Sequence, residues 1–201
     1  MSIYGEYEAI LQKVMEDIEG RLLAYQEKVQ SETGENAYEH LLARIKTDES
    51  MREKCVRKGL PETAETALVT MTDAIGIRVV CSFVDDVFNI VEYIRTFTDC
   101  EIIEEKDYIR HAKPNGYRSY HIILAVHTEE SDVLGNTPGT YYVELQIRTI
   151  AMDTWAALEH RMKYKKDIPN QELLVGELKR VADELASCDL SMQTIRELIN
   201  S

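Results

Sequence analysis

Residues 141–149 have the sequence YYVELQIRT, in which apolar and polar side chains alternate from Tyr142 onward. Successive side chains of a β-strand point to opposite faces, so the valine, leucine and isoleucine share one face. An antiparallel strand with its second face in water is one interpretation. That second face, however, carries an acid, an amide and a guanidinium in turn, Glu144, Gln146 and Arg148, and this favours a strand that lines a cleft.

An amphipathic helix is predicted directly after this strand, over Ile150–Lys163, with Trp155 and Leu158 expected to pack on a sheet. Residues 38–44 are ambiguous, and Ser50 with Glu53 is expected to form a capping box that starts the next helix. Periodicity predicts strands over residues 75–83, 101–109 and 118–127, and helices over residues 4–30, 51–58, 62–71, 84–98 and 171–200. This order predicts an α/β or α+β fold with a single mixed β-sheet of about five strands flanked by helices.

The composition excludes several classes of protein. A chain of 201 residues is expected to form one domain, and its net charge of −13 argues against a general nucleic-acid binder. The four cysteines are scattered without a C-x-x-C pair, which favours reduced thiols and a cytoplasmic protein. No basic start followed by an apolar run and no apolar stretch of 18 residues occurs, so neither secretion nor a membrane partner is expected.

Basic residues concentrate in one segment of this acidic chain. Residues 44–58 contain six Lys and Arg, among them Arg44, Lys46 and Lys54. A solvated helix face is the simple explanation of such a run. These bases flank an expected helix N-terminus, which is itself an anion site, so the segment is also a candidate for binding a compact polyanion such as a nucleotide.

An acid and a base lie at the start of an expected strand, in the sequence D-A-I-G-I-R from Asp73 to Arg78. An Asp at a strand start is commonly a turn residue. Two carboxylates from different strands, Asp73 and Glu144, could instead hold Mg²⁺, which proteins bind through one or two carboxylates together with phosphates and water.

A rigid turn presents an aromatic residue between bases in K-P-N-G-Y-R-S-Y-H, residues 113–121. A hairpin turn with a half-buried Tyr117 is the simple interpretation. The functional interpretation is a platform on which a base stacks, with phosphate ligands beside it.

Taken in order, these motifs resemble the synthetase domain of the RelA/SpoT family. The matching patterns are R-I-K-x-x-x-S-x-x-x-K, D-x-x-G-x-R, K-P-N-G-Y-R-S-x-H and E-x-Q-I-R-T-x-x-M-D-x-W-A-x-x-E-H, and they span about residues 40–165. The short chain and its flanking helices resemble the small alarmone synthetases of the RelQ type. We therefore expect one synthetase domain over residues 1–201, with a catalytic core at about 40–165 and helical extensions at 1–36 and 167–201.

The resemblance implies a nucleotidyltransferase-like fold and an Mg²⁺-dependent transfer of pyrophosphate from ATP to the 3′-OH of GDP or GTP. The products would be AMP and ppGpp or pppGpp. By motif position it implies that Asp73 and Glu144 hold Mg²⁺, with Glu144 also accepting the 3′-OH proton. It implies ATP contacts from Arg44, Lys46, Ser50, Lys54 and Arg78, and acceptor contacts from Lys113, Asn115, Tyr117, His121 and Gln146.

Several points stay open at this level. Residues 104–107, E-E-K-D, lie between the acidic and basic versions of the long enzymes, so GDP, GTP and GMP all remain candidate acceptors. No His-Asp dipeptide of the family's hydrolase domain occurs, so synthesis without hydrolysis is expected. The resemblance implies a homotetramer with an allosteric site for (p)ppGpp or RNA. The alternatives are a silent nucleotide- or RNA-binding module and a nucleotidyltransferase that releases pyrophosphate.

Overall fold

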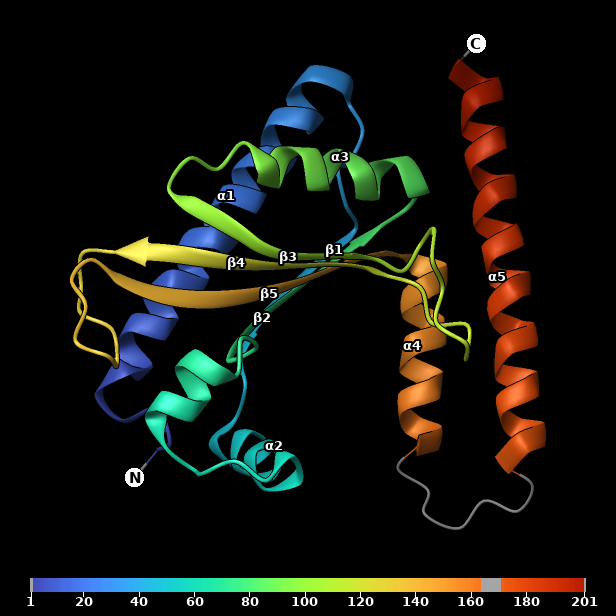
Figure 1. Cartoon of the computed structure of the whole chain (residues 1–201). Coiled ribbons are helices and arrows are strands. Elements are labelled where there is room, and N and C mark those ends of the chain that lie inside the picture. Colours follow the sequence, from blue (N-terminus) through green and yellow to red (C-terminus); the bar gives the residue numbers. More distant parts are fainter. Residues whose placement is uncertain (1, 164–170, 201) are drawn as a thin grey trace.

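The computed structural model describes residues 2–163 and 171–200. They form a single sheet with helices around it (Figure 1). The boundary expected between the core and the C-terminal extension, at residues 165–167, lies outside the described residues.

The sheet has five strands in the order β1-β2-β5-β4-β3. Its strands are β1 (His40–Ile45), β2 (Ile75–Cys81), β3 (Cys100–Asp107), β4 (Tyr120–Thr128) and β5 (Gly139–Thr149). Strands β2 and β5 pair in parallel at the centre, and the other three pairings are antiparallel. The prediction of one mixed sheet of about five strands is therefore confirmed, and the ambiguous segment near residue 40 is the edge strand β1.

Helices α1 and α3 cover one face of the sheet (Figure 1). The helices are α1 (Glu8–Thr33), α2 (Asp48–Lys58), α3 (Val84–Arg95), α4 (Ile150–Lys163) and α5 (Gln171–Asn200), with the short turns η1 (Gly5–Tyr7) and η2 (Thr66–Thr70). The buried residues of α1 and α3, such as Ile18 and Ile90, pack with Val143, Leu145 and Ile147 of β5 in one core. The apolar face of β5 thus lies inward as its alternation predicts, and its polar face lies on the opposite side of the sheet.

Helix α4 continues directly from the end of β5 and runs beside α5 (Figure 1). Trp155 of α4 is buried, and its indole Nε1 donates a hydrogen bond of 2.7 Å to the carbonyl oxygen of Leu178 on α5. Leu158 is 40% exposed, so the expectation that it packs on a sheet is wrong. The main partner of α4 is helix α5 rather than the sheet, so the sheet does not cover the Leu158 side chain.

Helix α2 starts at Asp48, three residues earlier than the predicted capping box requires. Its N-cap is Thr47, whose side-chain oxygen accepts a hydrogen bond from the backbone N–H of Ser50. The expectation that Ser50 is the cap, with Glu53 as its partner, is therefore wrong, because Thr47 already holds the extended backbone that a cap needs. The helix ends at Lys58 and is capped by Gly59, whose φ of 66° is the left-handed conformation expected of a glycine at this position.

The four cysteines are free, as predicted. Among the residues that the structure describes, no helix is long and apolar enough to cross a membrane.

Candidate active site

The register of the sheet brings the polar side chains of three distant segments into two neighbouring rows. Arg44 of β1 lies opposite Gly76 of β2, and Gly76 lies opposite Glu144 of β5. In the next row, Arg78 of β2 lies opposite Gln146 of β5. Residues that face each other across strands share a face of the sheet, so both rows lie on the face that α1 and α3 leave uncovered.

A cavity of about 340 Å³ opens over these rows. It is lined by Leu42, Ala43, Arg44, Lys46, Asp73, Gly76, Ile77, Arg78, Glu144 and Gln146. Gly76 is at its floor, where no described atom lies within 4 Å of the point that a Cβ would occupy. A side chain at this position would fill the cavity, so the absence of one keeps the floor open.

The basic residues of the first motif meet Asp73 at this cavity. Lys46 and Lys54 both donate to Asp73 Oδ2, the latter over 2.5 Å. Burial alone would raise the pKa of Asp73, but the two ammonium groups outweigh burial and hold its pKa below the usual value. We call Arg44, Lys46, Lys54, Asp73 and Arg78 the charged cluster.

Glu144 lies beside the charged cluster and beside a histidine of β4. Its Oε1 is 3.4 Å from His121 Nδ1, and its Oε2 accepts a hydrogen bond of 3.2 Å from Gln146 Nε2. Burial raises the pKa of Glu144, but contacts with His121 and the Gln146 amide lower it by more than burial raises it. The pKa therefore lies below its usual value, and the carboxylate is held in its charged form. A half-buried, ionised carboxylate with few hydrogen-bond partners can accept a proton or a cation.

An aromatic cluster lies on the other side of Glu144, formed by Tyr108, Lys113, Tyr117, His121 and Trp155. The Tyr117 hydroxyl is 2.8 Å from His121 Nε2, and the rings of Tyr108 and Trp155 approach Tyr117 edge-on at 6.0 and 6.1 Å. Lys113 Nζ lies over the rings of both tyrosines, at 4.4 Å from Tyr108 and 4.8 Å from Tyr117. The cluster therefore combines flat apolar surfaces with one cation.

The turn that presents Tyr117 is docked on α5. Gly116 has a φ of 92°, and a Cβ built on it would come within 2.5 Å of the Cβ of Ala182. Only glycine fits both the backbone conformation and this approach. Asn115 Nδ2 in the same turn donates a hydrogen bond of 3.0 Å to Glu159 of α4, so the turn is held by both C-terminal helices.

The predicted site residues differ in whether the structure places them at the cavity. Arg44, Lys46, Asp73, Arg78, Glu144 and Gln146 line the cavity, and Lys54 reaches it through Asp73. Ser50 lies in the exposed first turn of α2, where its hydroxyl accepts a hydrogen bond of 2.9 Å from Thr47. Asn115 is engaged with Glu159.

Sequence reasoning assigned no chemical role to four residues that the structure brings to these clusters, although it placed one of them, Arg148, on a face that lines a cleft. They are Tyr108, Arg148, Asp153 and Glu159. For Arg148 a signal was present, because it shares the polar face of β5 with Glu144 and Gln146. Asp153 and Glu159 stand in the last motif, but nothing in their spacing shows that they meet Arg78 and Asn115.

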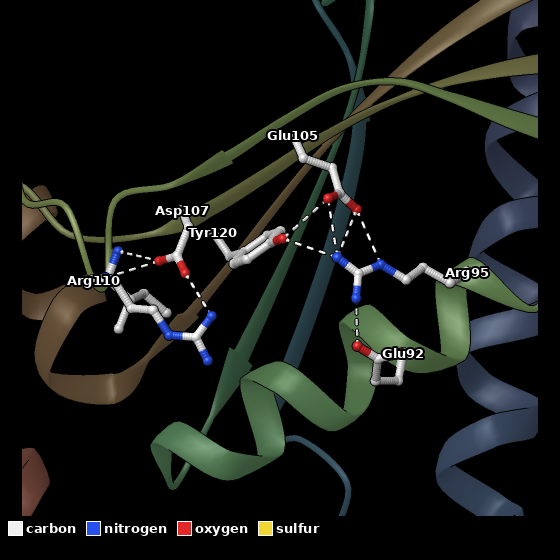
Figure 2. A network of polar contacts seen from close by, with 7 residues as sticks. Glu92, Arg95, Glu105, Asp107, Arg110 and Tyr120 are labelled. Atoms are coloured by element: carbon white, nitrogen blue, oxygen red, sulfur yellow. Dashed lines mark hydrogen bonds and ion pairs between the residues drawn. The ribbon is translucent and has the colours of Figure 1, made fainter.

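Residues 104–107 divide between the two faces of the sheet. Figure 2 shows that Glu105 joins Arg95 of α3 and the hydroxyl of Tyr120, while Asp107 holds Arg110. Lys106 lies opposite His121 and pairs with Glu104 over 2.7 Å. Of the four residues, Glu104 and Lys106 are thus the two on the side of the aromatic cluster.

The charged cluster contains groups that suit a divalent cation. Asp73 Oδ1 is buried and has no hydrogen-bond partner among the described residues, and Glu144 lines the same cavity. In the described part of the chain no three His, Cys, Asp or Glu side chains gather into a closed metal cage. Two carboxylates at an open cavity fit Mg²⁺, which takes its remaining ligands from phosphates and water.

Comparisons with known proteins identify the family of this chain. The region found in RelA and SpoT proteins matches residues 43–169. The chain is 36% identical to the GTP pyrophosphokinase YwaC of Bacillus subtilis (strain 168), over 94% of this chain and 95% of that protein. It is 31% identical to the GTP pyrophosphokinase YjbM of the same organism, over 92% of this chain and 84% of that one.

A solved structure shares the whole architecture. The small alarmone synthetase 1 of Bacillus subtilis, bound to its product pppGpp, superimposes with a TM-score of 0.81 at 30% identity, over 95% of each chain. Full-length similarity in sequence and fold, together with a family match that covers the charged cluster, leads to one assignment. The chain belongs to the RelA/SpoT family and, within it, to the small alarmone synthetases.

Proposed function

We propose that the protein synthesises (p)ppGpp by transferring pyrophosphate from ATP to the 3′-OH of GDP or GTP, with release of AMP. The observation that carries this proposal is the position of Glu144 between a charged cluster and an aromatic cluster. The relatives named GTP pyrophosphokinase and the relative bound to pppGpp support the same activity.

ATP is assigned to the charged cluster. Arg44 and Arg78 lie in the two neighbouring rows over the cavity, where planar guanidinium groups can stack on adenine. Lys46 and Lys54 provide ammonium groups for the phosphates. Burial lowers the pKa of Lys46 even though the ammonium group contacts Asp73. A further negative charge beside Lys46, such as a phosphate, would therefore stabilise its charged form. Ser50, in the first turn of α2, is assigned to the phosphates through the helix N-terminus.

The acceptor nucleotide is assigned to the aromatic cluster. Tyr117 provides a stacking surface for guanine, and Lys113 must leave the Tyr117 ring if the base stacks on the face that the ammonium covers. Asn115, His121 and Gln146 are the polar groups around this surface. His121 contacts both Tyr117 and Glu144, so an acceptor bound here is next to the candidate base.

The reaction needs little covalent work from the protein. The 3′-oxygen bonds to the β-phosphorus of ATP, the bond from that phosphorus to the α–β bridging oxygen breaks, and the 3′-OH proton passes to Glu144. Positioning of the two nucleotides and neutralisation of phosphate charge then supply most of the catalysis. Asp73 and Glu144 would hold Mg²⁺, which when bound neutralises charge on the phosphates.

The test is incubation of the protein with ATP, Mg²⁺ and GDP, followed by mass analysis of the products. AMP and ppGpp in equal amounts, with ppGpp stable afterwards, are expected. Free pyrophosphate would assign the chain to the nucleotidyltransferases that release it. Nucleotide binding without any product would assign it to silent binding modules.

A homotetramer is part of the proposal. Most apolar residues of α1, such as Leu11 and Leu22, are buried in the core, whereas many of those on α5 are exposed. Seven large apolar side chains of α5 are at least half exposed, namely Leu173, Val175, Leu190, Met192, Ile195, Leu198 and Ile199. A surface of this kind is stabilised by contact with another subunit. Light scattering at micromolar concentration should give four times the mass of the chain, and a monomer would overturn the proposal.

Such an assembly would also bring copies of the chain around a central cleft. We assign the allosteric nucleotide, (p)ppGpp or RNA, to that cleft. Titration of the tetramer with each ligand, with synthesis rate as the readout, distinguishes the two.

A further inference from the structure

Arg148 is a cation that is almost completely buried. It lies at the end of β5 with 2% of its surface exposed, on the same face as Glu144 and Gln146. Burial lowers the pKa of its guanidinium, because the charged form loses its contact with water. A charge in such a place is tolerated only when it is paired and hydrogen-bonded, so its partners indicate its role.

The partners of Arg148 are all residues of the candidate site. Its Nη2 donates to Gln146 Oε1, and its Nη1 is 3.4 Å from Asp153 Oδ1. The same Asp153 oxygen is 3.5 Å from Arg78 Nη1, so one carboxylate faces two guanidinium groups. The Nε atoms of both arginines are buried without a hydrogen-bond partner among the described residues. Two guanidinium groups that share one carboxylate leave a net positive charge, so this group is more than a structural ion pair.

The contact with Gln146 fixes which way its amide points. A guanidinium carries donors and no acceptor, so Arg148 can bind the oxygen of the Gln146 amide and not its nitrogen. The amide nitrogen is then left facing Glu144, to which it donates over 3.2 Å. With the amide reversed, two donors would face each other at Arg148 and the amide oxygen would face the Glu144 carboxylate.

We propose that Arg148 is a positioning residue that orients Glu144 through the amide of Gln146. The relay runs along one face of β5, from Arg148 to Gln146 to Glu144, which are successive residues on that face. Through Asp153 the relay is also connected to Arg78 in the charged cluster. The proposal rests on the proposed function in one respect, because it takes Glu144 as the group that accepts the 3′-OH proton.

The first test measures Glu144 without any turnover. Carboxyl ¹³C resonances are followed against pH in the free wild-type protein, with Glu144 identified by its loss in Glu144→Gln. The Gln146 amide is among the groups that lower the pKa of Glu144, so removal of the relay should raise that pKa. Arg148→Met and Gln146→Met should both show the rise, and their double variant should show no further rise.

Arg95→Met is the matched control, because Arg95 binds Glu105 on the opposite side of the sheet (Figure 2). It should leave the Glu144 titration unchanged. Circular dichroism confirms that each variant is folded. If Arg148→Met does not fold, Gln146→Met breaks the same relay at a less buried residue.

The second test measures synthesis against pH. In the two relay variants kcat should fall about 10- to 100-fold, and the acid limb of the profile should move to higher pH. An unchanged Glu144 titration in folded Arg148→Met and Gln146→Met would overturn the relay. If the wild-type protein makes no (p)ppGpp while the Glu144 titration shifts as expected, the proposed function fails and the relay stands.

Discussion

The charged cluster and the aromatic cluster lie on either side of Glu144, yet they are built by different physical means. Asp73 forms ion pairs with two lysines in the charged cluster. Ring contacts hold the aromatic cluster, where Tyr117 touches Tyr108, His121 and Trp155 edge-on. The difference matches the two ligands proposed for the clusters, because a polyphosphate is recognised by charge and a nucleobase by a flat surface.

The two clusters also differ in how the chain supports them. The charged cluster comes from β1, β2 and the helix that follows β1, so the sheet register sets its geometry. The aromatic cluster is carried by a turn that is pressed on α5 and tied to α4. We therefore expect substitutions in the charged cluster to affect ATP and those in the aromatic cluster to affect the acceptor, while Glu144 affects both.

The largest effect is expected where the two clusters meet. Asp73→Gly and Glu144→Gln should each lower the rate of synthesis by at least about two orders of magnitude, because each removes a carboxylate proposed to hold Mg²⁺. The double variant should be little worse than either single one, since the two act as a unit. Rates of ppGpp formation by folded variants measure this, and near wild-type rates would end the assignment of both residues.

The next largest effect is expected on the affinity for ATP, from a substitution in the charged cluster. Arg44→Gly should weaken ATP far more than GDP, because the lost guanidinium is proposed to contact adenine and the phosphates beside it. Isothermal titration with each nucleotide measures the two affinities. Arg57→Ala changes an exposed base of α2 outside the cavity and serves as the control. Equal weakening of ATP and GDP would move Arg44 out of the ATP site.

The corresponding effect on the acceptor side is smaller. Tyr117→Ala should remove about 1–3 kcal/mol of stacking, which raises KM for GDP about 5- to 150-fold and leaves KM for ATP nearly unchanged. Tyr117→Phe keeps the ring and loses only the hydroxyl contact with His121, so its KM for GDP should stay close to that of the wild type. If Tyr117→Ala leaves KM for GDP unchanged, Tyr117 is a turn residue and no stacking surface.

The smallest effect concerns the stability of the charged cluster against pH. The pKa of Asp73 is lowered in the folded chain, so its ion pairs stabilise the fold above the unfolded pKa of about 3.8. That stability is lost as pH falls through the folded pKa. Between about pH 4 and pH 2 the free energy of unfolding should therefore fall more steeply in the wild type than in Asp73→Asn. Parallel urea denaturation series measure the difference, and identical slopes would show that the ion pairs are not coupled to folding.

The sequence determined the strand pattern and the chemistry of the site. The alternation of residues 141–149 identifies β5 and its polar face, because a strand can bury only every second side chain when one face is packed. The four motifs identify the family, and eleven of the twelve site residues that they predict lie in or beside the two clusters, Ser50 on the exposed first turn of α2 being the exception.

Only the tertiary structure decided which of these side chains meet. Asp73 and Glu144 are 71 positions apart in the printed numbering, and the parallel pairing of β2 with β5 brings their segments to one cavity. The packing of Trp155 against α5, the exposure of Leu158 and the sharing of Asp153 by two arginines depend on how the last helices dock. Local periodicity sets which face of an element is apolar, but the partner of that face and the contacts of buried charges are set by the whole fold, and sequence spacing does not encode them.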